Sequence, residues 1–249
     1  MNKISTTKDL REKYFKFLDH DQSSPRDESD SLLFPEISEI RFKEVKYNMS
    51  NGGVLNFSLI LKKPFRILII GKSGSGKTTL FNLISGAVPL TTGKIFYIGK
   101  DGEEVRNKFV PIVYQTPHIF DTTVRNNITL FQNRLYDDDM LKMILRKINL
   151  YDELESNSLL EFECGENGYK LSGGQKQKIA LARALVRSRD IYLFDEISAN
   201  LDKENSRQIH NLLFDLDISF IEIAHHYDVS DNRYTNIYSL ENGQLNQVK

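Results

Sequence analysis

The sequence lacks the features expected of a secreted or membrane-embedded chain. It has one cysteine, Cys164, so no disulfide can form within the chain. No basic flank precedes an apolar run at the N-terminus, and no apolar stretch approaches the roughly 20 residues that a membrane-spanning helix needs. We therefore expect a cytosolic protein. If it serves a membrane process, another polypeptide supplies the span.

An excess of charge of either sign is also missing. The chain carries 33 Lys and Arg against 34 Asp and Glu, which gives a formal net charge of -1. Such a balance offers no broad positive surface to a phosphate backbone, so no nucleic-acid partner is expected. With 249 residues, 40% of them hydrophobic, the chain is long enough to bury the core of one or two domains.

The pattern predicts a small N-terminal segment followed by one α/β domain. Residues 1–35 combine a short amphipathic helix, with Leu10, Tyr14 and Leu18 at helical spacing, and a charged, serine-rich linker. Strand and helix patterns then alternate through residues 36–249, which is typical of an α/β fold. We predict strands at 39–47, 54–61, 66–70, 109–114, 190–195 and 219–224, and helices at 137–149, 173–188 and 202–216.

Two other sets of polar residues are interpreted without a metal. The acidic run Asp137 to Asp139 stands where a helix is predicted to begin, and acids are favoured there by the unpaired amides and the helix dipole. His20, His118 and His210 are isolated from other ligand types in the sequence, so solvated or packing roles are expected for them.

A phosphate-binding loop is predicted at residues 71–79. RILIIGKSGSGKTTL matches G-x-x-x-x-G-K-[ST], with a buried strand before it and a helix after it. Loop amides and the helix N-terminus suit phosphate, Lys77 can reach the β- and γ-phosphates, and the Thr78 hydroxyl can bind Mg²⁺. The context disfavours a glycine-rich turn with an incidental lysine. The predicted site comprises Gly71, Lys72, Ser73, Gly74, Ser75, Gly76, Lys77, Thr78 and Thr79.

Two carboxylates in DIYLFDEISANLD complete the chemistry that such a loop needs. Asp195 ends an apolar strand, where it can hold Mg²⁺. Glu196 follows it and could orient or deprotonate the water that attacks the γ-phosphate. The alternative for Glu196 is a charge at a helix start. Its pairing with a phosphate loop favours catalysis.

A second glycine-rich helix start, YKLSGGQKQKIALARAL, lacks a lysine and hydroxyl of that kind. The order GKSGSGKT, glutamine, LSGGQ, LFDE and a histidine after a buried strand resembles the ATP-binding cassette (ABC) ATPases over residues 36–249. LSGGQ is the most specific of these motifs. The resemblance implies a P-loop NTPase core with a mixed sheet, an antiparallel β subdomain, and an inserted helical subdomain at about 116–188 that carries the signature.

The resemblance implies that two cassettes pack head to tail around ATP. Ser172, Gly173, Gly174 and Gln175 of one chain would then bind the γ-phosphate held by Lys77 of the other. The second anion site needs no Mg²⁺ ligand of its own, because the partner chain supplies it.

Further site residues follow from the resemblance one by one. Gln115 resembles the glutamine that touches Mg²⁺ and the water and links to the transmembrane partner; the alternative is a solvated strand end. His225 resembles the histidine on the γ-phosphate, and its spacing from the strand favours it over His226. Asp202 resembles the aspartate that communicates across the dimer and also suits the N-cap of the following helix, and both roles can hold together.

One position departs from the family pattern. The aromatic that stacks on adenine falls on Met49, two residues beyond Tyr47. A thioether packs on a base but has no aromatic face, so Tyr47 is the possible substitute.

Segments around the motifs resemble exporters. PHIFDTTVRNNI, and ECGENGYKLSGG with Glu166, resemble the parts that face the membrane domain, and the N-terminal helix with its polar tether resembles the joint to that domain. We therefore expect an ATPase subunit or domain on the cytoplasmic side of the membrane, acting with a transmembrane domain and a second nucleotide-binding domain. The alternatives are an importer ATPase and a soluble, translation-associated cassette. The stretch between Lys77 and Asp195 is too short for the long insertion of DNA-repair cassettes.

Overall fold

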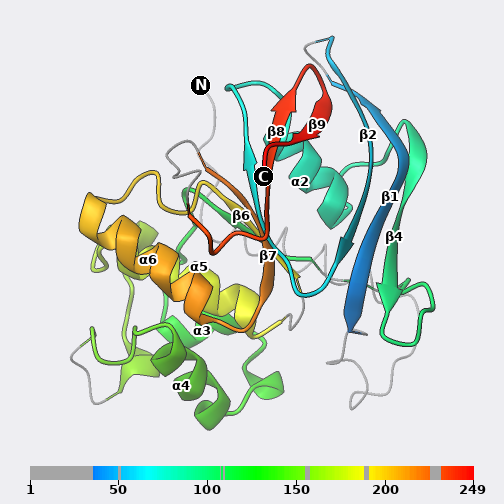
Figure 1. Cartoon of the computed structure of the whole chain (residues 1–249). Helices are drawn as coiled ribbons and strands as arrows, with labels where there is room; N and C mark the ends of the chain where they lie inside the picture. Colours follow the sequence, from blue (N-terminus) through cyan, green and yellow to red (C-terminus); the bar gives the residue numbers. More distant parts are fainter. Residues whose placement is uncertain are drawn as a thin grey trace, which may run out of the picture.

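The computed structural model describes residues 36–49, 52–106, 108, 110–154, 158–187, 191–224 and 231–249. Within them the chain forms two β-sheets and a group of helices gathered on one side (Figure 1). The predicted N-terminal helix and linker lie outside the described residues. None of the helices in the described ranges has the length and apolarity to cross a bilayer.

The smaller sheet is antiparallel, in the order β2-β1-β4. Its long central strand buries apolar side chains such as Ile40, Phe42 and Val45 against α2 and the larger sheet. The pairing shifts between Phe42 and Val45, where Glu44 has a φ of 48°. The strands are β1 (Ile37–Asn48), β2 (Val54–Lys62) and β4 (Thr92–Gly99).

The larger sheet has the order β5-β6-β7-β3-β8-β9, parallel except for β9, which runs antiparallel to β8. Every residue of β6 is buried, because both faces of the sheet are covered. Tyr192 and Phe194 enter one core, and Ile191 and Leu193 enter the other. The strands are β3 (Arg66–Ile70), β5 (Ile112–Tyr114), β6 (Ile191–Asp195), β7 (Ser219–Ile223), β8 (Asn236–Glu241) and β9 (Gln244–Gln247).

The helices divide between the two cores. α2 packs between the sheets, whereas α3, α4 and α5, which lie between β5 and β6 in the chain, share the other core with α6 (Figure 1). The helices are α2 (Lys77–Ser85), α3 (Val124–Thr129), α4 (Asp138–Lys147), α5 (Gly173–Leu185) and α6 (Lys203–Asp215), with 3-10 turns η1 (Asn133–Leu135), η2 (Leu159–Glu161) and η3 (Glu166–Gly168).

The predicted fold class is confirmed: a phosphate-loop core with a mixed sheet, an antiparallel sheet and a helical insertion. The bounds 116–188 for the helical subdomain stay a prediction. The predicted strand 109–114 is shorter in the described chain, and β4, β8, β9 and α3 were not predicted. The four residues of β9, QLNQ, show no apolar alternation, and α3 has six residues, too few for a clear helical period.

Candidate functional site

The loop between β3 and α2 has two positions that only glycine fits. A Cβ on Gly76, whose φ is 102°, would lie 2.7 Å from the sulfur of Met49. A Cβ on Gly71 would lie 2.6 Å from the carbonyl oxygen of Leu240. The close approach of Met49, which follows β1, and of Leu240, in β8, therefore requires the glycines that the motif supplies.

Lys77 is folded back over this loop. Its Nζ donates hydrogen bonds to the carbonyl oxygens of Gly71, at 2.8 Å, and Lys72, at 3.1 Å. Burial lowers the pKa of Lys77, while the nearby charges of Glu196 and then Asp195 act in the opposite direction. One ammonium group is thus held against the loop and close to both predicted carboxylates.

The side-chain oxygens beside this lysine suit a phosphate and Mg²⁺. The Thr78 hydroxyl donates a hydrogen bond of 3.2 Å to Oδ2 of Asp195, so the first turn of α2 meets the last residue of β6. Within the described part of the chain, the buried Ser75 hydroxyl has no hydrogen-bond partner and offers a donor in the loop. Mg²⁺ is commonly bound by one or two protein oxygens together with substrate phosphates, and this donor set fits it.

Glu196 has an uncommon backbone conformation, with φ at 53°. Its N–H donates to the carbonyl oxygen of Ile223 at 2.9 Å, which ties it to the end of β7. α6 begins only at Lys203, so the alternative interpretation of Glu196 as a helix-start charge does not hold. Left-handed φ values at residues other than glycine are enriched at functional sites.

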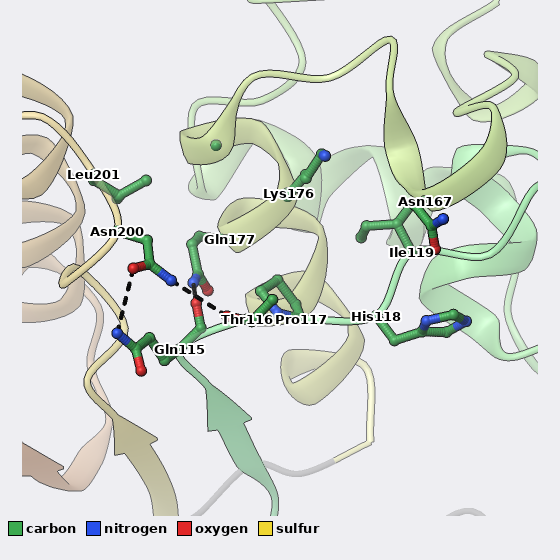
Figure 2. A pocket seen from close by; sticks show the side chains of 11 residues that line it. Gln115, Thr116, Pro117, His118, Ile119, Asn167, Lys176, Gln177, Asn200 and Leu201 are labelled. Carbon is green, nitrogen blue, oxygen red and sulfur yellow. Dashed lines mark hydrogen bonds between the residues drawn. The ribbon is translucent and has the colours of Figure 1, made fainter. Parts of the chain in front are cut away.

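Gln115 leaves the sheet beside the carboxylates, because Tyr114 pairs with Asp195 in the β5–β6 ladder. Its amide nitrogen donates to Oδ1 of Asn200 at 3.4 Å (Figure 2). The amide of Gln177, in α5, donates to the Gln115 carbonyl oxygen at 2.6 Å. Gln115 is therefore partly buried and hydrogen-bonded to two neighbouring segments.

These contacts line a cleft of about 450 Å³ between α5, the segment after β5 and the loop after β6 (Figure 2). Asn200 also donates to the Thr116 hydroxyl at 3.2 Å. The sequence analysis missed Asn200 and Gln177. Asn200 stands in the SANLD segment that was already considered, whereas nothing in the sequence distinguishes Gln177 from any buried polar residue of a helix.

The signature LSGGQ begins α5 with a capping box. The Ser172 hydroxyl accepts a hydrogen bond from the Gln175 N–H, and Oε1 of Gln175 accepts one from the Ser172 N–H. A Cβ on Gly173 would lie 3.1 Å from Leu201, and one on Gly174 would lie 3.1 Å from Asn205. The signature therefore lies beside the loop after Glu196, and Ser172 and Gly173 are exposed.

Asp202 caps α6, as one of its two predicted roles required. It accepts hydrogen bonds from the Asn205 N–H at 2.9 Å and from the Asn205 amide at 2.6 Å. These hydrogen bonds lower the pKa of Asp202. Its predicted role across a dimer stays a proposal.

The remaining predicted residues have different outcomes. Met49 packs against Gly76, and Tyr47 is half-buried near the end of β1, so both adenine-stacking alternatives remain compatible with the fold. His225 and His226 lie outside the described residues. In the sequence they come directly after Ala224, the residue that follows β7. That strand stands between β3 and β6 in the sheet. The interpretation of the acidic run is confirmed at Asp137, which caps α4.

The two other histidines predicted to have ordinary roles contact protein groups. The ring of His118 packs edge to face on Phe120, with centroids 4.6 Å apart. Nε2 of His210 lies 3.0 Å from the Ser198 hydroxyl. His20 lies outside the described residues.

Comparisons with known proteins agree with this geometry. The model of the ABC transporter family matches residues 54–199. The ATP-dependent lipid A-core flippase of Francisella novicida is 34% identical over 201 residues, which are 78% of this chain and 34% of that protein. The glutathione/L-cysteine transport system ATP-binding/permease protein CydD of Bacillus subtilis is 29% identical over 234 residues, 90% of this chain and 40% of that protein.

The chain thus spans between a third and two fifths of the length of these relatives. A solved structure of a bacterial Atm1-family ABC exporter with ATP bound matches with a TM-score of 0.70 at 24% identity, over 96% of this chain and 43% of that one. The similarity to this solved structure shows a shared fold.

Proposed function

Because the chain belongs to the ABC transporter family, we propose that it is the ATP-hydrolysing part of an exporter, which drives transport by closing on a second nucleotide-binding domain around ATP. The matched relatives are named as a flippase and as an ATP-binding/permease protein, which favours an exporter over an importer ATPase or a soluble cassette. In this proposal the chain lies on the cytoplasmic side of the membrane, against the transmembrane domain of the exporter.

The observation that carries the proposal is the meeting of Lys77, Thr78 and Asp195 at the ends of β3 and β6. Lys77 would turn from the loop carbonyls to the β- and γ-phosphates, while the loop amides and the Ser75 hydroxyl bind the remaining oxygens. Mg²⁺, held by Thr78 and Asp195, would offset the charge that develops on the phosphates.

Residues at the neighbouring strand ends would handle the attacking water. Glu196 would act as general base and accept a proton from the water. The backbone of Glu196 is held in place by its hydrogen bond to the Ile223 carbonyl. Gln115 would help to orient the water. His225, the second residue after β7 in the sequence, would contact the γ-phosphate, as the resemblance implies. Tyr47 or Met49 would pack on the adenine.

The signature would serve the nucleotide of the partner. Ser172 uses its oxygen as an acceptor in the capping box, so its hydroxyl hydrogen remains to be donated to a γ-phosphate. Gly173 is exposed and has no side chain, and Gly174 is buried next to Asn205. A nucleotide bound by the partner could therefore approach the first turn of α5 closely. Asp202 would contribute from the start of α6.

Glu196→Gln tests this function. The variant should bind ATP, hydrolyse it about 100-fold or more slowly because it lacks the general base, and elute as a dimer in ATP and Mg²⁺. The control is Glu241→Gln, an exposed residue at the end of β8, which should behave as the unmodified chain. Absence of ATPase activity in the unmodified chain, or a normal rate in Glu196→Gln, would overturn the proposal.

A further inference from the structure

A polar cluster, buried at Glu222 and Tyr234 and partly buried at Ser198 and His210, joins four segments of the chain. It consists of Ser198, in the loop after β6; His210, in α6; Glu222, in β7; and Tyr234, before β8. We call this set the Glu222 cluster. β7 is otherwise apolar in its centre, so a carboxylate there requires polar partners.

Glu222 is 1% exposed, and the cluster supplies a neighbour for each of its oxygens. The Tyr234 hydroxyl donates to Oε2 at 2.7 Å. Nε2 of His210 lies 3.2 Å from Oε1, an ion-pair contact when the imidazole is protonated, and Oε1 has no hydrogen-bond partner among the described residues. The same Nε2 atom lies 3.0 Å from the Ser198 hydroxyl. His210 is therefore the link between a side chain of β7 and the loop that follows Glu196.

Aromatic rings enclose these groups. Phe214 and Phe220 lie 5.4 Å apart, and Tyr234 packs on Phe214 at 5.0 Å. Burial raises the pKa of Glu222, and the charge of His210 and the hydrogen bond from Tyr234 oppose that shift. In such surroundings the approach of Nε2 of His210 to Oε1 of Glu222 is favoured, because this buried oxygen has no hydrogen-bond partner among the described residues.

The loop that receives this link begins at a strained residue. Glu196 has a left-handed φ, and its N–H is bonded to Ile223, the residue after Glu222. Ser198 stands two positions further along the loop. β7 thus holds the turn at two points, by its backbone at Ile223 and by its side chain at Glu222 through His210.

We infer that His210 is a positioning residue for hydrolysis: by bridging Glu222 and Ser198 it fixes the turn that presents the Glu196 carboxylate. This inference rests on the proposed function. Lys77 and Thr78, which would bind phosphate and Mg²⁺, lie in the first turn of α2 and not in the turn that contains Glu196 and Ser198. Loss of the bridge should therefore slow the chemical step and leave nucleotide affinity in place, because a misplaced general base loses rate and little binding.

The experiment compares three variants of α6 in steady-state ATPase assays. His210→Leu should lower kcat roughly five- to tenfold, the equivalent of one hydrogen bond, and keep KM for ATP within about twofold. His210→Gln, whose amide nitrogen can replace Nε2, should recover most of the rate. Gln208→Leu, at an exposed position of the same helix bonded to Glu204, is the matched control and should leave kcat unchanged.

A double variant tests the route through Ser198. Ser198→Ala should lower kcat about as much as His210→Leu, and the two changes together should be no worse than either alone, because both break one link. Additive losses, a normal kcat in His210→Leu, or equal losses in His210→Gln and His210→Leu would overturn the inference. If His210→Leu does not fold in thermal melts, a normal kcat in Ser198→Ala overturns it.

The failure of this inference is distinguishable from failure of the proposed function. An unmodified chain without ATPase activity would refute the function itself. An active unmodified chain with an unaffected Ser198→Ala variant would refute the positioning role of His210 alone.

Discussion

The hydroxyl of Thr78 donates a hydrogen bond to the carboxylate of Asp195, which joins the first turn of α2 to the last residue of β6. The two residues are far apart in the sequence. They meet because β3 and β6 are parallel strands on either side of β7, so that their carboxyl ends lie at one edge of the sheet.

From this pair we predict that part of the affinity for ATP depends on Mg²⁺. Asp195→Asn should weaken ATP binding in Mg²⁺ and leave binding in EDTA nearly unchanged, because the amide keeps the hydrogen bond with Thr78 but loses the charge that holds the cation. Isothermal titration in both conditions measures the difference. Asp152→Asn, at an exposed residue, is the control. Equal weakening with and without Mg²⁺ would contradict the assignment.

The packing of Met49 on Gly76 leads to a prediction about the base. With a thioether in place of a ring, binding should depend mostly on phosphates, so ATP and GTP should compete within a few fold of each other. Met49→Tyr should tighten ATP binding, since stacking of a base on an aromatic contributes about 1–3 kcal/mol. A titration without any gain would indicate that Tyr47 already stacks on the base.

The cap at Ser172 allows a sharp test of the signature. In the Glu196→Gln background, Ser172→Asp should prevent the ATP-dependent dimer by placing a negative charge against the partner's γ-phosphate. Ser172→Asn, a neutral residue, should retain much more of it. Both replacements are good N-caps, so α5 should form in each. Size exclusion in ATP reports the dimer.

Each of these two variants should also keep the affinity of the monomer for ATP, measured separately by titration. A dimer that tolerates Ser172→Asp, or a joint loss of dimer and monomer affinity, would show that LSGGQ serves its own chain.

Glu222 predicts a dependence of stability on pH. Burial raises its pKa above the ordinary value of 4.5, so the folded chain binds its proton more tightly than the unfolded chain does. The contribution of Glu222 to stability is then complete below the unfolded pKa and is lost as pH rises through the folded pKa. Glu222→Gln removes this loss.

Thermal melts at acidic and mildly alkaline pH measure this effect. The Tm of Glu222→Gln relative to the unmodified chain should become more favourable at the higher pH. A difference that is constant with pH, or that has the opposite sign, would mean that Glu222 is not held in the protonated form by burial.

The sequence was sufficient for the parts of the site that are continuous in the chain. The loop around Lys77, the strand end at Asp195 and the helix start at the signature are local patterns, in which neighbouring residues determine the geometry. The α/β class followed from the alternation of strands and helices, whereas the antiparallel sheet and the helical insertion were implied by the resemblance to the ABC ATPases.

Contacts between distant segments could not be predicted in this way. Gln177 reaches the carbonyl of Gln115 across the boundary between α5 and β5, and Glu222 meets His210 only because α6 packs on β7. Within its strand, Glu222 looks like one polar residue in an apolar run. Nothing in the sequence indicates which helix supplies its partner.

Because the backbone of Glu196 is left-handed, conformational stability and catalytic rate should change in opposite directions when this residue is replaced by glycine. In this conformation a residue with a Cβ is disfavoured by roughly 1–2 kcal/mol, which glycine would recover. Glycine would at the same time remove the carboxylate proposed to activate water. Selection for variants of higher thermal stability would therefore favour glycine at residue 196, the change that abolishes the proposed catalysis.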